Sequence, residues 1–379
     1  MKEDKKVPQL RFPEFTDAWK QRKLGDILKL LKDGTHGSHK DVTNGHYLLS
    51  AKNIKDGRIF WDKTDRIISD EDYKKIHSTF KINKGDVLLT IVGSIGETAI
   101  FNVSEEITFQ RSVAILRPID EVSSDFLYSE ITSPKFQKFL NLNKSTSAQP
   151  GIYLGDLANI SFSFPENKEE QKMIGRLFTG LNSTITLQQR KLNSLQKLKK
   201  GLLQKMFPKN GENIPEIRFP EFSDAWKQRK LEQIIDVGSG RDYKHLSEGG
   251  IPVYGTGGYM LSVNEALSWE EDAIGIGRKG TIDKPYILQA PFWTVDTLFY
   301  AIPKKEQDLD FLYCIFQNID WKKKDESTGV PSLSKTIINK TYCMTPNYDE
   351  QKKIGCFFSK IDNLITLQQR WLFYTHKQS

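Results

Sequence analysis

One stretch without proline, residues 169–207, most constrains what this chain can fold into. Its apolar residues recur at alternating steps of four and three, the heptad pattern of a helix that packs against another helix. At about 1.5 Å per residue such a helix is roughly 55–60 Å long, too long for the inside of one small domain. The stretch is therefore one helix of a bundle or, as we expect, a spacer between two bodies.

A second copy of this stretch starts at residue 349, and Ile-Thr-Leu-Gln-Gln-Arg stands at both 185–190 and 365–370. A glutamine breaks each apolar seam at the same heptad place. Two matching seams indicate that the helices pack on each other, with the glutamines fixing the register. The residues predicted to form this contact are Ile174, Phe178, Leu181, Ile185, Gln188, Leu192, Ile354, Phe358, Ile361, Ile365 and Gln368.

The opening of the chain is also duplicated. Residues 8–24 and 215–231 are identical at fourteen of seventeen positions, whereas the inserts that follow, 25–168 and 232–348, are barely alike. A shared frame is held by packing, while unlike inserts meet different targets. Strand-like runs, turn signals and a helix in each insert predict two mixed α/β domains, each with a curved sheet. The predicted insert helices are 126–140 and 309–318.

The expected fold class is α+β with a pseudo-twofold internal repeat, in which two long antiparallel helices separate the two domains. The predicted boundaries are a first domain at 1–165, a long helix at 166–208, a second domain at 209–346 and a short final helix at 347–379. After Arg370 the second copy departs from the first, so we expect the final helix to be about two turns shorter than its counterpart. Leu195, Leu202 and Met206 are then expected to lack full partners.

Composition excludes several classes of protein. The 379 residues suffice for two or three domains, no apolar run reaches the ~18 residues of a membrane span, and the first residues lack the apolar core of a signal peptide. Three cysteines, Cys314, Cys343 and Cys356, have no metal-binding spacing and are typical of a reducing cytoplasm.

The net charge of +7 is unevenly distributed. Residues 168–209 hold ten Lys or Arg and two Glu, a net +8, which leaves −1 for the rest of the chain. Such a basic segment is either a solvated helix face or a surface that faces a polyanion.

The sequence contains no complete catalytic set. Residues 275–280 fit G-x-G-x-x-G, but turn and strand signals follow where a dinucleotide site needs a helix. We therefore expect a tight turn that presents Arg278 and Lys279. A phosphate loop for ATP and the base-gripping motif of an aminomethyltransferase are both missing.

Two further motifs are incomplete. Residues 166–168 resemble half of a nuclease carboxylate–lysine pair without the other half. His36, His39 and His46 are close in sequence but have no Cys nearby, and they lie in a glycine-rich segment. We interpret this segment as a polar loop and keep a metal site as the alternative.

Groups that bind nucleic acid are plentiful by contrast. Arg, Lys, Asn and Gln read base edges, and Lys and Arg hold phosphates, although each residue alone could be ordinary surface charge. The candidates for DNA binding are Gln110, Arg111, Lys144, Gln149, Arg241, Tyr243, Lys244, Arg278, Lys279 and Lys335. The candidates for contact with the backbone of an unread DNA spacer are Lys197, Lys199, Lys200 and Lys205.

Taken together, several motifs resemble the specificity subunit of a type I restriction–modification system over nearly the whole chain. They are Arg-Phe-Pro-Glu-Phe-x-x-x-Trp at 11–19 and 218–226, Asp-Gly-Thr-His at 33–36, Ile-Gly-Arg-Lys-Gly-Thr-Ile at 276–282, Thr-Leu-Phe-Tyr at 297–300, and Glu-Gln-x-x-Ile-Gly at 170–175 and 350–355. The set is specific, although no single motif is.

The resemblance implies two target-recognition domains that each read half of a bipartite site in double-stranded DNA. It also implies that the helices dock two methyltransferase subunits and that restriction/translocase subunits join through the complex. This chain is then expected to carry no catalytic residue, metal or cofactor, because S-adenosylmethionine, ATP and Mg²⁺ belong to the partner subunits. The expected location is the bacterial cytoplasm, away from membranes. The shorter final helix leaves docking of the second methyltransferase open.

Two other interpretations remain at this point. The chain could be a single-chain regulator with two binding domains, such as a DNA-looping protein, which needs no partner. It could also be a self-sufficient nuclease–methylase, against which the missing motifs count.

Overall fold

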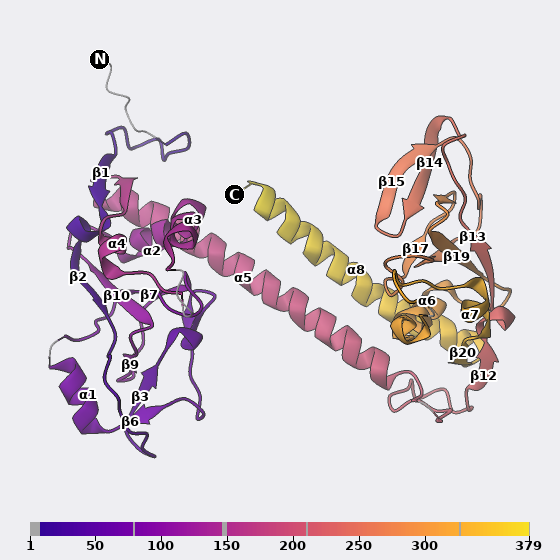
Figure 1. The fold of residues 1–379 in the computed structure, drawn as a ribbon, viewed down its shortest axis with the longest axis horizontal. Helices are drawn as coiled ribbons and strands as arrows, with labels where there is room; N and C mark the ends of the chain where they lie inside the picture. The colour runs from indigo at the N-terminus through magenta and orange to yellow at the C-terminus, as the bar shows by residue number, and fades with distance from the viewer. Residues whose placement is uncertain (1–7, 79, 146–149, 210, 326, 379) are drawn as a thin grey trace. The chain divides into compact units, whose positions relative to one another are not determined.

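The computed structural model describes residues 8–78, 80–145, 150–209, 211–325 and 327–378. The chain divides into two compact units, Met1–Leu187 and Gln188–Ser379. Each unit combines small sheets and short helices with part of a long helix (Figure 1). No helix in the described ranges is both long enough and apolar enough to cross a membrane.

The first unit is built on a four-stranded antiparallel sheet in the order β2-β10-β7-β8. A three-stranded sheet, β6-β3-β9, and the pairs β1–β11 and β4–β5 complete its strands. The strands are β1 (Lys20–Lys23), β2 (Leu28–Asp33), β3 (His46–Leu49), β4 (Ile54–Lys55), β5 (Arg58–Ile59), β6 (Ile67–Ile68), β7 (Val87–Thr90), β8 (Thr98–Ile100), β9 (Thr108–Phe109), β10 (Val113–Pro118) and β11 (Ser161–Phe164). The short helices are α1 (Asp70–His77), α2 (Ser124–Thr132), α3 (Pro134–Asn143) and α4 (Leu154–Ala158).

The helix predicted at 126–140 is two helices in the structure, α2 and α3. Proline has no backbone N–H and clashes with the preceding turn, so Pro134 ends the first helix and takes the first turn of the second. The Ser133 hydroxyl then accepts a hydrogen bond from the Phe136 N–H and caps α3.

The second unit repeats this topology. Its main sheet is antiparallel with the order β13-β19-β16-β17, and β15-β14-β18 and β12–β20 correspond to the smaller sheets of the first unit. The strands are β12 (Lys227–Lys230), β13 (Ile235–Ser239), β14 (Glu248–Gly255), β15 (Gly258–Val263), β16 (Ala273–Gly277), β17 (Tyr286–Leu288), β18 (Trp293–Thr294), β19 (Leu298–Pro303) and β20 (Tyr342–Thr345). The short helices are α6 (Leu309–Asn318), as predicted, and α7 (Lys335–Lys340). The predicted α+β class with an internal repeat is confirmed.

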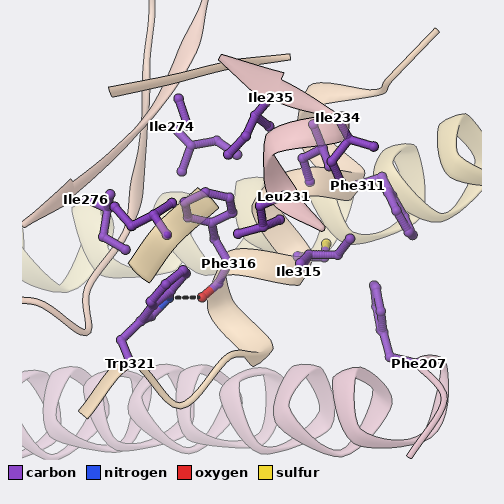
Figure 2. Close-up of a cluster of buried hydrophobic side chains, with 14 of the residues drawn as sticks. Phe207, Leu231, Ile234, Ile235, Ile274, Ile276, Phe311, Ile315, Phe316 and Trp321 are labelled. Atoms are coloured by element: carbon purple, nitrogen blue, oxygen red, sulfur yellow. Dashed lines mark hydrogen bonds between the residues drawn. The ribbon is translucent and has the colours of Figure 1, made fainter. Parts of the chain in front are cut away.

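The core of the second unit lies between its main sheet, α6 and the ends of the long helices. Ile274 and Ile276 of β16 face the α6 residue Phe316, and the indole of Trp321 donates to the Phe316 carbonyl at 2.8 Å (Figure 2). Phe207, just beyond the end of a long helix, stacks on Phe311 with ring centroids 5.5 Å apart.

Two long helices carry the repeated seams. They are α5 (Lys168–Lys205) and α8 (Tyr348–Gln378). Within the second unit, residues 188–205 of α5 run antiparallel to α8 (Figure 1). The Gln368 amide donates to Gln188 at 2.6 Å, and Lys199 pairs with Asp362 at 2.5 Å. These two contacts fix the register of the pair.

Burial along the seams is uneven. Leu192, Ile354, Phe358 and Ile361 are buried, Ile174, Ile185, Gln188, Ile365 and Gln368 are half-buried, and Phe178 and Leu181 are each 48% exposed. The expectation that Leu202 and Met206 lack partners is wrong, since Met206 is buried in the second core and Leu202 packs against it. Antiparallel packing brings the end of α5 to the beginning of α8, where that helix is complete.

A buried carboxylate joins the duplicated opening of the chain to each long helix. In the second unit, the fully buried Glu350 accepts hydrogen bonds from Arg218 Nε at 2.7 Å and from the Trp226 indole at 3.3 Å. The hydrogen bond to Glu350 raises the pKa of Arg218 above its ordinary value. The Arg218 guanidinium thus stays charged, and its hydrogen bonds to Glu350 hold the opening segment on α8.

The first unit has the same clamp on α5. Glu170, also fully buried, accepts from Arg11 Nε at 2.6 Å and from the Trp19 indole at 3.2 Å. Next to it, Gly175 lies so close to the start of α2 that a Cβ would be 2.5 Å from the Phe126 nitrogen. The Glu-Gln-x-x-Ile-Gly motif therefore serves as a docking element for each helix.

We predict that Glu350→Ala lowers the free energy of unfolding by about 3–5 kcal/mol, because it leaves the Arg218 charge without its partner. Urea unfolding of the whole chain measures this change. The control is Glu216→Ala, which removes an exposed carboxylate that bridges Lys205 and Lys209 and should alter the unfolding curve little. Equal effects of the two substitutions would contradict the role of the clamp.

Candidate nucleic-acid interface

A glycine-bracketed turn in the second unit presents Arg278 and Lys279. It follows β16, and the Arg278 N–H donates to the Thr297 carbonyl at 2.8 Å. Gly280 has a φ of 85°, a left-handed value that favours glycine, and its N–H donates to the Pro331 carbonyl at 2.8 Å. The expected turn is therefore present and is anchored to the segment before α7.

The side chains of this turn form an exposed basic edge. The Arg278 guanidinium lies over the Phe299 ring, 5.8 Å from its centroid, and remains exposed. Lys279 forms a β-bridge with Ser332, three residues before the exposed Lys335 that begins α7. Three predicted cations thus come from two segments that the bridge joins. A guanidinium held by a ring beneath it is well placed for bidentate contact with a base.

A second surface of this unit gathers the other predicted residues. The Trp293 indole donates to the Arg241 carbonyl at 3.0 Å, and Tyr243 packs on the small core around Trp293. Tyr243 and Lys244 line a hollow of about 670 Å³ whose other side is β15, with Tyr259 exposed there. The β14–β15 hairpin that forms this surface was not predicted.

In the first unit, Gln110 and Arg111 line a hollow of about 350 Å³ together with His36, His39 and Arg66. Backbone hydrogen bonds place them, because the Gln110 N–H donates to Leu49 and the Arg111 N–H donates to Thr35. Arg66 was not among the predicted residues. The available sequence signal for this hollow was the nearby Asp-Gly-Thr-His motif. Its glycine, Gly34, packs so closely that a Cβ there would clash with the Phe109 carbonyl.

The two histidines of this hollow are engaged with carboxylates. His36 Nε2 lies 2.5 Å from Asp33, and His39 Nδ1 lies 3.1 Å from Asp72. Arg66 donates to the His39 carbonyl at 2.6 Å. Among the residues that the structure describes, no three His, Cys, Asp or Glu are grouped to hold a metal ion. The hollow offers hydrogen-bond donors and positive charge.

Lys144 is exposed at the end of α3, next to a segment that joins the sheet. Gly151 forms a β-bridge with Val92, the counterpart of the bridge between Lys279 and Ser332. In each unit, therefore, the residue two positions after a central strand forms a bridge with a residue shortly before a short helix. Gln149 lies outside the described residues.

The basic segment of α5 corrects one prediction. Lys197 and Lys200 are exposed, and Lys205 pairs with Glu216 at 2.8 Å. Lys199 is buried against Asp362, so it is not available to a DNA backbone. The sequence could not show this, because the partner lies 163 positions away.

The two buried or half-buried cysteines are poorly suited to act as nucleophiles. Burial raises the pKa of the Cys314 thiol, and it raises the pKa of the Cys343 thiol to about 12. Both therefore stay protonated and are poor nucleophiles at neutral pH.

Comparisons with known proteins identify the family of this chain. The family model described as "Type I restriction modification DNA specificity domain" matches residues 16–197 and 223–372. The type I restriction enzyme MjaVIII specificity subunit of Methanocaldococcus jannaschii is 23% identical over 409 residues, which cover 97% of this chain and 90% of that protein. The EcoBI specificity subunit of Escherichia coli is 26% identical over 198 residues, 50% of this chain and 41% of that protein.

The fold is shared with solved structures, including that of an S subunit. The crystal structure of a type I restriction-modification S subunit from M. genitalium aligns with a TM-score of 0.68 and 17% identity, covering 97% of this chain and 95% of that one. At this identity the likeness establishes the fold alone.

We predict that Arg278→Ala weakens binding to a specific DNA site by about 1–3 kcal/mol, because a bidentate contact with guanine is lost. Titration of the assembled complex with specific and random duplexes measures the difference. Lys305→Ala, which removes an exposed charge from the loop after β19, is the matched control and should leave the discrimination unchanged. An equal loss on both duplexes would show that Arg278 contacts only phosphate.

Proposed function

This chain belongs to the family of type I restriction–modification specificity subunits, and on that premise we propose how its two units divide the recognition of DNA. Each unit reads one half of a bipartite double-stranded target, and the long helices dock the methyltransferase subunits. The observation that carries the proposal is the internal comparison. Both units have the same sheet order and the same Arg–Trp–Glu clamp, whereas the exposed residues on their surfaces differ.

The surfaces support reading more than catalysis. Arg278 and Lys279 in one unit, and Gln110 and Arg111 in the other, lie on anchored backbone where side chains can meet base edges. The chemistry of the complex is then left to its partners. In this proposal two methyltransferase subunits bind S-adenosylmethionine, restriction/translocase subunits use ATP and Mg²⁺, and the complex works in the bacterial cytoplasm.

The alternatives make different predictions. A DNA-looping regulator would bind its two sites tightly as an isolated chain, without a methyltransferase. A self-sufficient nuclease–methylase would transfer labelled methyl groups by itself. Co-expression with the methyltransferase, followed by mapping of methylated adenines, separates all three.

We predict that the two inserts are exchangeable reading elements. When residues 25–165 are replaced with the insert of a relative that has another target, half of the methylated site should change and the other half should stay. The matched control replaces residues 232–346, for which the opposite half should change. Methylome sequencing reads both outcomes, and a change in both halves from one exchange would refute the division.

The helix pair supplies a further expectation for the gap between the half-sites. Because α5 joins the two units covalently, its length limits how far apart they can read one duplex, an expected separation of about 34 Å or one helical turn. In the second unit the register contacts Gln188–Gln368 and Lys199–Asp362 lie on either side of residue 196. A length change must therefore be made in both helices.

We predict that four residues inserted after Gln196, with four more after Ile365, lengthen the unread gap by one or two base pairs. Each helix then gains about 6 Å, against about 3.4 Å per base-pair step. Methylome sequencing should show unchanged half-sites at the longer spacing. Insertion in α5 alone is the control, since it separates one register pair and should destabilise the protein. Methylation at the old spacing by the doubly extended protein would rule out this use of the helices.

A further inference from the structure

The β14–β15 hairpin distinguishes the second unit from the first. β3 and β14 are counterparts, because each pairs in parallel with a short strand, β9 or β18. β3 pairs with β6 at two positions, and residues 50–66 lie between those strands. β14 pairs with β15 from Glu248 to Gly255, and only residues 256–257 join them. The hairpin lies on the side of its unit away from β12 and β20 (Figure 1).

A β-bulge next to the turn of this hairpin leaves two large side chains in solvent. Val253 is opposite Leu261 and Tyr254 is opposite Tyr259, so Met260 is the extra residue of the bulge. Bulges re-aim the side chains beside them. Tyr259 is 63% exposed and Met260 is 49% exposed. An aromatic ring is thus presented to solvent beside the turn.

The backbone beneath this ring is fixed at two points. The Tyr286 hydroxyl donates a hydrogen bond to the Gly255 carbonyl at 2.6 Å. The Val295 N–H donates to the Tyr254 carbonyl at 3.0 Å. These bonds tie the turn to β17 and to the segment after β18, so Tyr259 is carried by an anchored strand.

The segment after β18 also supports the turn that presents Arg278. Residues 295–297 begin at the contact with Tyr254. At their other end, the Thr297 carbonyl accepts a hydrogen bond from the Arg278 N–H at 2.8 Å. Tyr259 and Arg278 are therefore carried by two turns that share one short support.

The charge of the hairpin suits close approach to a polyanion. Residues 249–263 contain no charged side chain, so no carboxylate of the hairpin repels phosphates. Tyr243 and Lys244 line the hollow beside β15. The hairpin is thus continuous with the candidate DNA-binding residues on one flank and reaches Arg278 through residues 295–297. The major groove of DNA admits a two-stranded β-ribbon, and aromatic rings stack on bases, so the occupant that fits this surface is duplex DNA.

We propose that Tyr259 is a stacking wedge for the second half-site. The hairpin turn enters the major groove beside the guanine that Arg278 contacts, and the Tyr259 ring inserts at the neighbouring base step and unstacks it. Pyrimidine–purine steps unstack most readily, so the second unit selects such a step without a hydrogen bond to it. The inference rests on the proposed function and adds to it the recognition of DNA deformability.

The test uses the assembled complex and duplexes of the mapped target that carry 2-aminopurine, a base whose fluorescence rises when it loses its stacking neighbours. One position in the second half-site should brighten on binding. Tyr259→Ala should abolish that signal and weaken specific binding about tenfold, the effect of one lost stacking contact. Tyr259→Phe retains the ring and should retain the signal. Both variants should melt at the temperature of the unaltered protein, because the ring is largely exposed.

Two controls make the result specific. Tyr342→Ala alters a tyrosine that is 58% exposed on β20, on the other side of the same unit, and should change neither the signal nor the affinity. Brightening at the target adenines, which methyltransferases flip out of the stack, should survive Tyr259→Ala.

Two results would overturn the wedge and leave the proposed function standing. One is an equal signal from Tyr259→Ala and the unaltered protein. The other is brightening at no position except the target adenines in a complex that still binds its site. Absence of specific binding by the unaltered complex would refute the wedge and the proposed function together.

Discussion

The burial of one carboxylate in each unit is the interaction on which the rest of the structure depends. A charge buried in a protein interior must be paired, and Glu170 and Glu350 are paired with an arginine and a tryptophan that lie over 120 positions away in the chain. This pairing ties the opening segment of each unit to the first turn of its long helix. Within each unit the sheets and the start of the long helix are thereby held together, which gives each candidate DNA-binding surface a fixed base.

The direction of the two long helices determines which of their apolar residues are buried. Because the second half of α5 runs antiparallel to α8, the end of one helix meets the beginning of the other. Met206 and Phe207 therefore complete the second core, while Phe178 and Leu181 stay exposed. The asymmetry between two nearly identical seams follows from direction and length.

The candidate DNA-binding surfaces use backbone geometry more than regular secondary structure. Arg278 lies on a turn that a left-handed glycine and two backbone hydrogen bonds hold in place. Arg111 is anchored by a hydrogen bond from its backbone N–H to the Thr35 carbonyl. Segments of this kind can change their side chains while the sheet beneath them stays the same. This property explains how one frame carries two unlike inserts in a single chain.

The sequence by itself determined the repeat, the two long helices, the helix at 309–318 and the turn at Arg278, because these depend on local periodicity and on glycine. Asp-Phe-Leu-Tyr at 125–128 and 310–313 would have extended the repeat into α2 and α6. Only the tertiary structure decided that Lys199 is buried beside Asp362, that Arg66 joins the hollow of Gln110, and that Phe178 is exposed while Phe358 is not. The reason is physical: a heptad pattern identifies the apolar side of a helix, but burial is set by what the fold brings to that side from elsewhere in the chain.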